Sequence, residues 1–94
     1  MVIEIKRRAM NAIVQTAVYV EGLNTPGSGV RWMENVETEI EQIARSKAKF
    51  ALCKNLSLAK FNYRCYTYKG WVIAFRVSAT KFEVCRFIWG KRLT

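Results

Sequence analysis

The sequence contains no histidine and no aspartate. Without imidazole, it cannot form a Ser-His-Asp or Cys-His catalytic arrangement, use histidine as a general base or bind a metal through histidine. Its only acidic side chains are glutamates, seven in all. Four of them, Glu34, Glu37, Glu39 and Glu41, follow the polar side of a predicted helix, which is typical of a solvated face. We therefore predict no metal site and no cofactor.

Proline, glycine and cysteine are also scarce, with one, five and three residues respectively. This scarcity, with 51% hydrophobic residues, excludes collagen-like, linker and disordered classes. The cysteines, Cys53, Cys65 and Cys85, are odd in number and lack a C-x-x-C pair, so we expect buried reduced thiols. No apolar run reaches the roughly 20 residues that span a bilayer, so we expect a cytoplasmic protein with no membrane contact. Residues 1–94 have room for one core and predict a single domain.

Positive charge is abundant but unevenly placed. Residues 1–46 hold five basic residues and six glutamates, whereas residues 47–94 hold eleven basic residues and only Glu83. The net charge of +9 therefore comes entirely from the second half. Such an asymmetry favours a nucleic acid or an acidic protein as partner. For Glu83 itself we expect a cross-strand salt pair.

Apolar spacing predicts the order of elements. A short strand over Val2–Ile5 precedes helices over about Ala9–Glu21 and from Ser28, a possible N-cap, to Arg45 or Ser46. The period then becomes two, which predicts strands over 49–53, 61–68, 71–77 and 81–89, with 56–59 as a loop. We predict an α+β domain in which an N-terminal helical hairpin packs on one face of a mostly antiparallel four-stranded sheet.

Basic residues alternate with aromatic residues over the predicted sheet. Cations neutralise phosphates and aromatic rings stack on bases, so these residues are candidates for binding a target. The candidates are Lys54, Lys60, Arg64, Tyr66, Arg76, Arg86, Trp89, Lys91 and Arg92. An ordinary solvated sheet face would carry similar residues, and the pattern does not distinguish RNA from protein as partner.

The element order and the C-terminal sequence resemble the RelE/ParE superfamily of bacterial toxins, the toxin halves of type II toxin–antitoxin pairs. The residues Asn24-Thr25-Pro26 and Arg31-Trp32 are similar to the family's helical hairpin. The strongest likeness is the segment GWVIAFRV over 70–77, followed by a turn, the apolar strand 82–88 and Gly90-Lys91-Arg92. The resemblance spans nearly the whole chain.

The resemblance implies one of two mechanisms. RelE-like toxins cut mRNA on the ribosome, and Lys54, Arg64, Arg76 and Arg92 would then be the catalytic candidates. ParE-like toxins inhibit DNA gyrase and need no catalytic set. Val72 stands where the nucleases carry an arginine, and Trp89 where other branches carry histidine or tyrosine. We therefore expect a gyrase inhibitor, with the mRNA endonuclease as the alternative, so that enzymatic activity stays open.

The resemblance also implies a partner. A cognate acidic antitoxin would cover the toxin, and its negative charge would complement the basic second half. A third possibility, which rests on charge and aromatics alone, is a non-toxic basic nucleic-acid-binding module.

Overall fold

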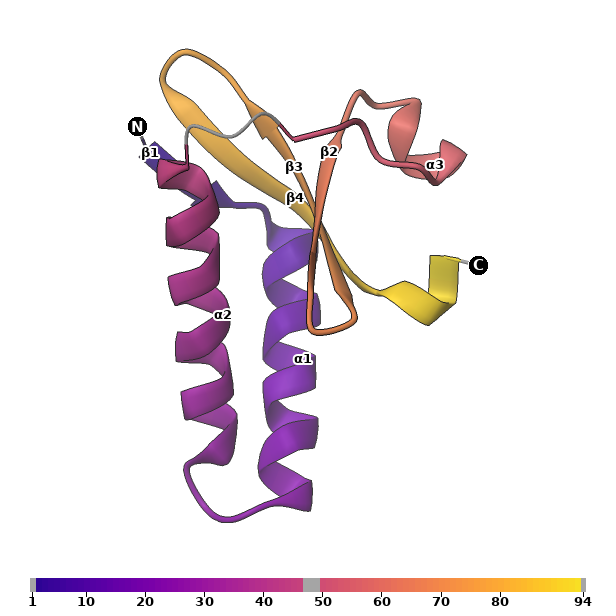
Figure 1. Ribbon diagram of the computed structural model, residues 1–94. Helices are drawn as coiled ribbons and strands as arrows, with labels where there is room; N and C mark the ends of the chain where they lie inside the picture. Colours follow the sequence, from indigo (N-terminus) through magenta and orange to yellow (C-terminus); the bar gives the residue numbers. More distant parts are fainter. Residues whose placement is uncertain (1, 47–49, 94) are drawn as a thin grey trace.

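Two long helices and a four-stranded sheet form the body of the computed structural model, which describes residues 2–46 and 50–93 (Figure 1). The elements are, in chain order, β1 (Val2–Ile5), α1 (Arg7–Leu23), α2 (Ser28–Arg45), α3 (Leu56–Ala59), β2 (Arg64–Tyr68), β3 (Trp71–Val77), β4 (Lys81–Trp89) and the 3₁₀ helix η1 (Gly90–Leu93).

The sheet has the strand order β1-β4-β3-β2. β1 pairs with β4 in parallel, and the other two pairs are antiparallel. The α1–α2 hairpin covers one face (Figure 1), and its buried residues Ile13, Val36 and Ile40 pack with Ile73 and Phe75 of the sheet. The predicted α+β fold, with its helical hairpin on one face of the sheet, is confirmed.

A β-bulge at Cys85 sets which side chains of β4 face the helices. Ala74 pairs with Arg86 whereas Phe75 pairs with Val84, so Cys85 is an extra residue in β4. The extra residue changes the alternation, and Phe87 joins Val84 in the helix-covered core. Strict alternation would have placed Phe87 on the opposite face.

The turn between α1 and α2 is held by a glutamate. Both carboxylate oxygens of Glu21 accept backbone hydrogen bonds, from the N–H groups of Gly27 and Gly29, each at 2.8 Å. These bonds lower the pKa of Glu21. The expectation that Ser28 caps α2 is wrong: Gly27 occupies the N-cap position, and the Ser28 hydroxyl donates to the carbonyl of Val20 in α1. The turn sets this geometry, because it brings Glu21 within reach of the free N–H groups at the start of α2.

The segment between α2 and β2 departs most from prediction. Of the predicted strand 49–53, Lys49 lies outside the described residues, and the rest forms only an isolated antiparallel bridge between Leu52 and Arg64. Residues 56–59 form the one-turn helix α3 rather than a loop, because the Asn55 side chain accepts from the N–H of Ser57 and caps it. β2 begins at Arg64, three residues later than predicted.

The expectation of three free thiols is wrong for two of them. Cys53 and Cys65 form a disulfide, with their Cα atoms 4.9 Å apart. Two backbone hydrogen bonds, Cys53 N–H to Tyr63 and Cys65 N–H to Ala51, bring the two segments side by side. Sequence spacing conceals this contact because the intervening residues fold back through α3. Cys85 is free and buried, as expected, and burial raises its pKa.

Candidate functional site

Two hollows lie on either side of η1, and Leu93 lines both of them. One lies between α3 and the sheet face that the long helices leave uncovered. The other lies between α1 and the second half of β4. We call them the α3 hollow and the α1–β4 groove. Neither arrangement follows from the sequence pattern alone, because each joins elements far apart in the chain.

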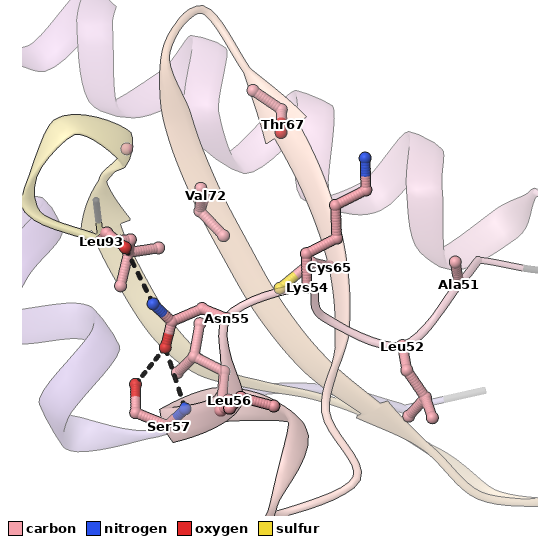
Figure 2. A pocket seen from close by; sticks show the side chains of 12 residues that line it. Ala51, Leu52, Lys54, Asn55, Leu56, Ser57, Cys65, Thr67, Val72 and Leu93 are labelled. Atoms are coloured by element: carbon pink, nitrogen blue, oxygen red, sulfur yellow. Dashed lines mark hydrogen bonds between the residues drawn. The ribbon is translucent and has the colours of Figure 1, made fainter.

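The α3 hollow has a volume of about 890 Å³ and is seen in Figure 2. On the side of the sheet, the hollow is lined by Cys65 and Thr67 of β2 and by Val72 of β3. On the side of α3, it is lined by Lys54 and Asn55, which precede that helix. Of the described residues that line it, all have neutral side chains except Lys54, which is exposed. This lining can bind an apolar segment or a single negative charge.

Asn55 fixes the shape of the α3 hollow. Its side-chain oxygen accepts from both the N–H and the hydroxyl of Ser57, and its amide nitrogen donates to the Leu93 carbonyl at 2.9 Å (Figure 2). One side chain therefore connects the start of α3 to the end of η1.

The α1–β4 groove has a volume of about 970 Å³. β1 pairs with β4 only as far as Val84, so the remaining edge of β4 faces α1 rather than another described strand. Three arginines line the groove, Arg8 from α1, Arg86 from β4 and Arg92 from η1, and none of the described residues that line it is acidic. Burial lowers the pKa of Arg86, and the positive charge of Arg8 lowers it further.

Aromatic rings form much of the wall of this groove. Trp71 and Phe87 stack with centroids 4.6 Å apart, and Trp32 meets Phe87 edge-on at 5.9 Å. Trp89 packs against Trp71 at 5.1 Å and lies over Gly70, where a Cβ would come within 2.7 Å of the indole. Gly70 also has a φ of +85°, so the position requires glycine on two counts.

The structure separates the predicted target-binding residues. Arg64 and Tyr66 lie opposite Phe75 and Ile73 on the helix-covered face of the sheet. The Tyr66 hydroxyl donates to Glu39 of α2 at 2.7 Å, which raises the tyrosine pKa. Tyr66 is therefore used in packing the sheet against α2.

The other candidates occupy different places. Arg76 is exposed on the opposite face, with its guanidinium 4.9 Å from the ring centroid of Tyr63. Lys60 ends α3 and lies 5.1 Å from the ring centroid of Phe61. Lys91 is exposed on η1. Arg86, Trp89 and Arg92 come together in the α1–β4 groove, while Lys54 lines the α3 hollow.

Sequence reasoning missed the contribution of α1 to the groove. Arg8, Ala12 and Tyr19 line it. Their spacing in the sequence places them on one side of a helix, and this spacing could have identified them as a shared surface. Arg8 lies in the half of the chain with no net positive charge, so the charge asymmetry gives no reason to place it in a basic site.

Glu83 forms an ion pair, as expected. Its partner is Lys6, the residue that follows β1, and the carboxylate oxygen lies 3.1 Å from the Lys6 Nζ. Its register partner in β3 is Arg76. Lys6 also pairs with Glu4 at 3.0 Å, and Glu4 pairs with Lys81 at 3.2 Å. The two glutamates raise the pKa of Lys6. Glu83 is thus part of a charge network at the β1 edge.

Among the described residues, no group of three cysteine or glutamate side chains is placed to hold a metal ion. No helix in the same part of the chain is long and apolar enough to cross a membrane.

Comparison with known proteins gives a structural likeness without a detectable relative in sequence. No family model matches the chain. No curated protein matches it either. Among solved structures, it is similar to a chain of the chromosomal ParDE TA system from P. aeruginosa, with a TM-score of 0.74. The alignment covers 93% of this chain and 92% of that chain, at 12% sequence identity. The protein therefore has the fold of that ParDE chain over almost its whole length.

Proposed function

We propose that this protein is the toxin of a type II toxin–antitoxin pair and that, free of its antitoxin, it inhibits growth by blocking DNA gyrase. The observation that carries the proposal is the fold shared with a ParDE chain over 93% of the protein. The resemblance of residues 70–77 and 90–92 to the RelE/ParE superfamily adds independent support, because it rests on residue types rather than on backbone shape.

The placement of the basic residues favours gyrase over mRNA as the target. A nuclease needs a base beside the attacking hydroxyl and cations beside the phosphate, all at one point. Lys54 lines the α3 hollow, Arg92 lines the α1–β4 groove, and Arg64 and Arg76 lie on opposite faces of the sheet. Among residues 2–46 and 50–93, no side-chain carboxylate lines the α3 hollow. A non-enzymatic inhibitor needs no such convergence.

Charge favours an acidic antitoxin as the partner. Residues 47–94 carry a net +10, and the α3 hollow offers an apolar lining with Lys54 at its side. An acidic segment that orders on binding suits such a surface. We place the action of the toxin in the cytoplasm, where gyrase works.

The first experiment is pulse labelling of DNA and protein synthesis in bacteria after induction of this chain alone. We expect DNA synthesis to fall first, and the purified protein to inhibit supercoiling by gyrase. The control is Ile73→Asp, which places a charge at a fully buried core position and should produce an inert protein at the same expression level.

Other outcomes identify the alternatives. If protein synthesis falls first and Arg64→Ala or Arg92→Ala restores it, the protein is an mRNA endonuclease. Harmless expression together with steeply salt-dependent nucleic-acid binding would instead support the non-toxic binding module.

A further inference from the structure

The α1–β4 groove combines unpaired positive charge with aromatic surface. We propose that it is a binding site for a nucleoside phosphate, with the phosphate held by Arg8, Arg86 and Arg92. The base lies against Tyr19 of α1 and Trp89 of β4, two of the aromatic residues that line the groove. The inference is independent of the toxin proposal, because direct binding to the purified protein tests it.

Charge identifies the ligand as an anion. Among the described residues, none of the ion pairs involves Arg8, Arg86 or Arg92, and no carboxylate lines the groove. Arg86 is partly buried, and the charge of Arg8 is close enough to disfavour its protonated form. A phosphate between them would offset both the burial and the repulsion, and would accept charge-assisted hydrogen bonds from the guanidinium groups.

The aromatic side chains identify what the anion carries. Trp32, Trp71 and Phe87 pack against one another and line part of the groove. Tyr19 is 66% exposed. Trp89 packs against Trp71 and lies over Gly70, but it is still partly exposed and lines the groove, so these two rings are the ones we assign to a planar ligand. A bare inorganic anion would use the arginines alone, whereas a nucleotide would use both kinds of side chain. The volume of about 970 Å³ is in the range of small-molecule sites.

The ligand could be a free nucleotide or part of a single strand, and calorimetric titration separates them. We would titrate the purified protein with AMP, a ten-nucleotide oligo(dA), ribose 5-phosphate and a poly-glutamate peptide. We expect AMP to bind roughly 10-fold more tightly than ribose 5-phosphate because of base stacking. For a single strand, three phosphate contacts predict a slope of about −2 for log K against log salt.

The key variant is the charge reversal Arg86→Glu, which should weaken AMP binding at least roughly 10-fold. Arg7→Glu is the matched control: it makes the same charge change next to Arg8, outside the groove lining, and should bind normally. Tyr19→Ala tests stacking at an exposed position where folding is not at risk. Circular dichroism and thermal melting would establish that each variant folds.

Tight AMP binding with weak oligo(dA) binding identifies a free nucleotide, and tighter, salt-sensitive oligo(dA) binding identifies a single strand. Three results would each contradict the proposal. The first is equal affinity for AMP and ribose 5-phosphate, and the second is binding of poly-glutamate that is as tight as that of AMP or tighter. The third is an equal loss of AMP affinity in Arg7→Glu and Arg86→Glu. Absence of binding by the folded protein would contradict it as well.

Discussion

Gly29 lies in the first turn of α2, where that helix crosses the end of α1, and it is buried. A Cβ at this position would overlap the Ala17 carbonyl oxygen and lie 3.1 Å from the Cβ of Glu21. The backbone atoms of α1 cannot move aside as a flexible side chain could. The absence of a side chain at one residue therefore sets how closely the two helices approach.

We expect Gly29→Ala to lower the free energy of unfolding by about 1–3 kcal/mol through overpacking. Gly22→Ala is the matched control, since Gly22 is helical and no atom of the described residues lies within 4 Å of its added Cβ. That variant should gain about 0.5–1 kcal/mol because alanine favours the helix. Urea unfolding measures both, and a Gly29→Ala protein as stable as the wild type would contradict the close approach.

Tyr66 provides a second test at the residue scale. Removing its hydroxyl in Tyr66→Phe breaks the hydrogen bond to Glu39 and should cost about 1 kcal/mol of unfolding free energy. In a spectrophotometric titration, one tyrosine should ionise above the usual value of 10.0, because ionised Tyr66 would lose that bond and be repelled by the Glu39 charge. Glu39→Gln should remove much of this shift, and an unchanged titration curve would argue against the contact.

At the scale of elements, the Cys53–Cys65 disulfide attaches the α3 segment to the edge strand β2. It closes a loop between positions 12 residues apart, and a loop of that length stabilises the folded state by about 3 kcal/mol through the entropy of the unfolded chain. A reducing compartment favours the thiol form of such a bond. The attachment of α3 to the sheet therefore depends on whether the surroundings of the protein are oxidising or reducing.

We expect the double variant Cys53→Ala/Cys65→Ala to melt at a lower temperature than the oxidised protein. A reductant should lower the melting temperature of the wild type and leave the double variant unchanged. Thiol counting in denaturant should find one free thiol in the oxidised protein, from Cys85, and three after reduction. Three thiols before reduction would mean that the disulfide does not form in the purified protein.

At the scale of the whole molecule, charge makes stability depend on acid and salt. The pKa values of Glu4 and Glu21 are both lowered in the folded protein, by Lys6 and Lys81 for Glu4 and by backbone N–H groups for Glu21. A lowered folded pKa contributes stability that is present above the ordinary value of 4.5 and lost as pH falls through the folded value. Protonating all seven glutamates also leaves sixteen positive charges unopposed.

We therefore expect the melting temperature to fall as pH drops below 4.5, the ordinary glutamate value. Added salt should restore part of the loss by screening repulsion among the basic residues. Glu21→Gln should be less stable than the wild type at neutral pH and should lose less stability on acidification. A wild-type melting temperature that does not change with pH in this range would contradict these ion pairs and hydrogen bonds.

The spacing of apolar residues predicted most of the long helices and strands. The bounds of β1, β3 and β4 match, and the stripe over residues 28–45 gives α2. The prediction failed in residues 50–63, where Leu52 makes only a bridge and residues 56–59 form a helix. That segment packs Cys53 and Leu58 against Ala74, and this distant contact decides its shape.

The basic and aromatic candidates could be named from the sequence, but their positions relative to one another could not. Of the nine candidates, Arg86, Trp89 and Arg92 line one groove, whereas Tyr66 turns toward α2 and Arg76 lies on the opposite face. Arg8 joins them from the other half of the chain. The alternation of side chains along a strand shows which residues share a face of the sheet, but it does not show which face the helices cover.

The sequence by itself determined the fold class, the charge asymmetry and the absence of histidine chemistry, because these depend on composition and on the spacing of neighbouring residues. The tertiary structure alone decided the bulge at Cys85, the Cys53–Cys65 contact and the meeting of Arg8 with Arg86. Each joins or reorients residues through contacts that are distant in sequence. Such contacts depend on how whole elements pack, which no local pattern records.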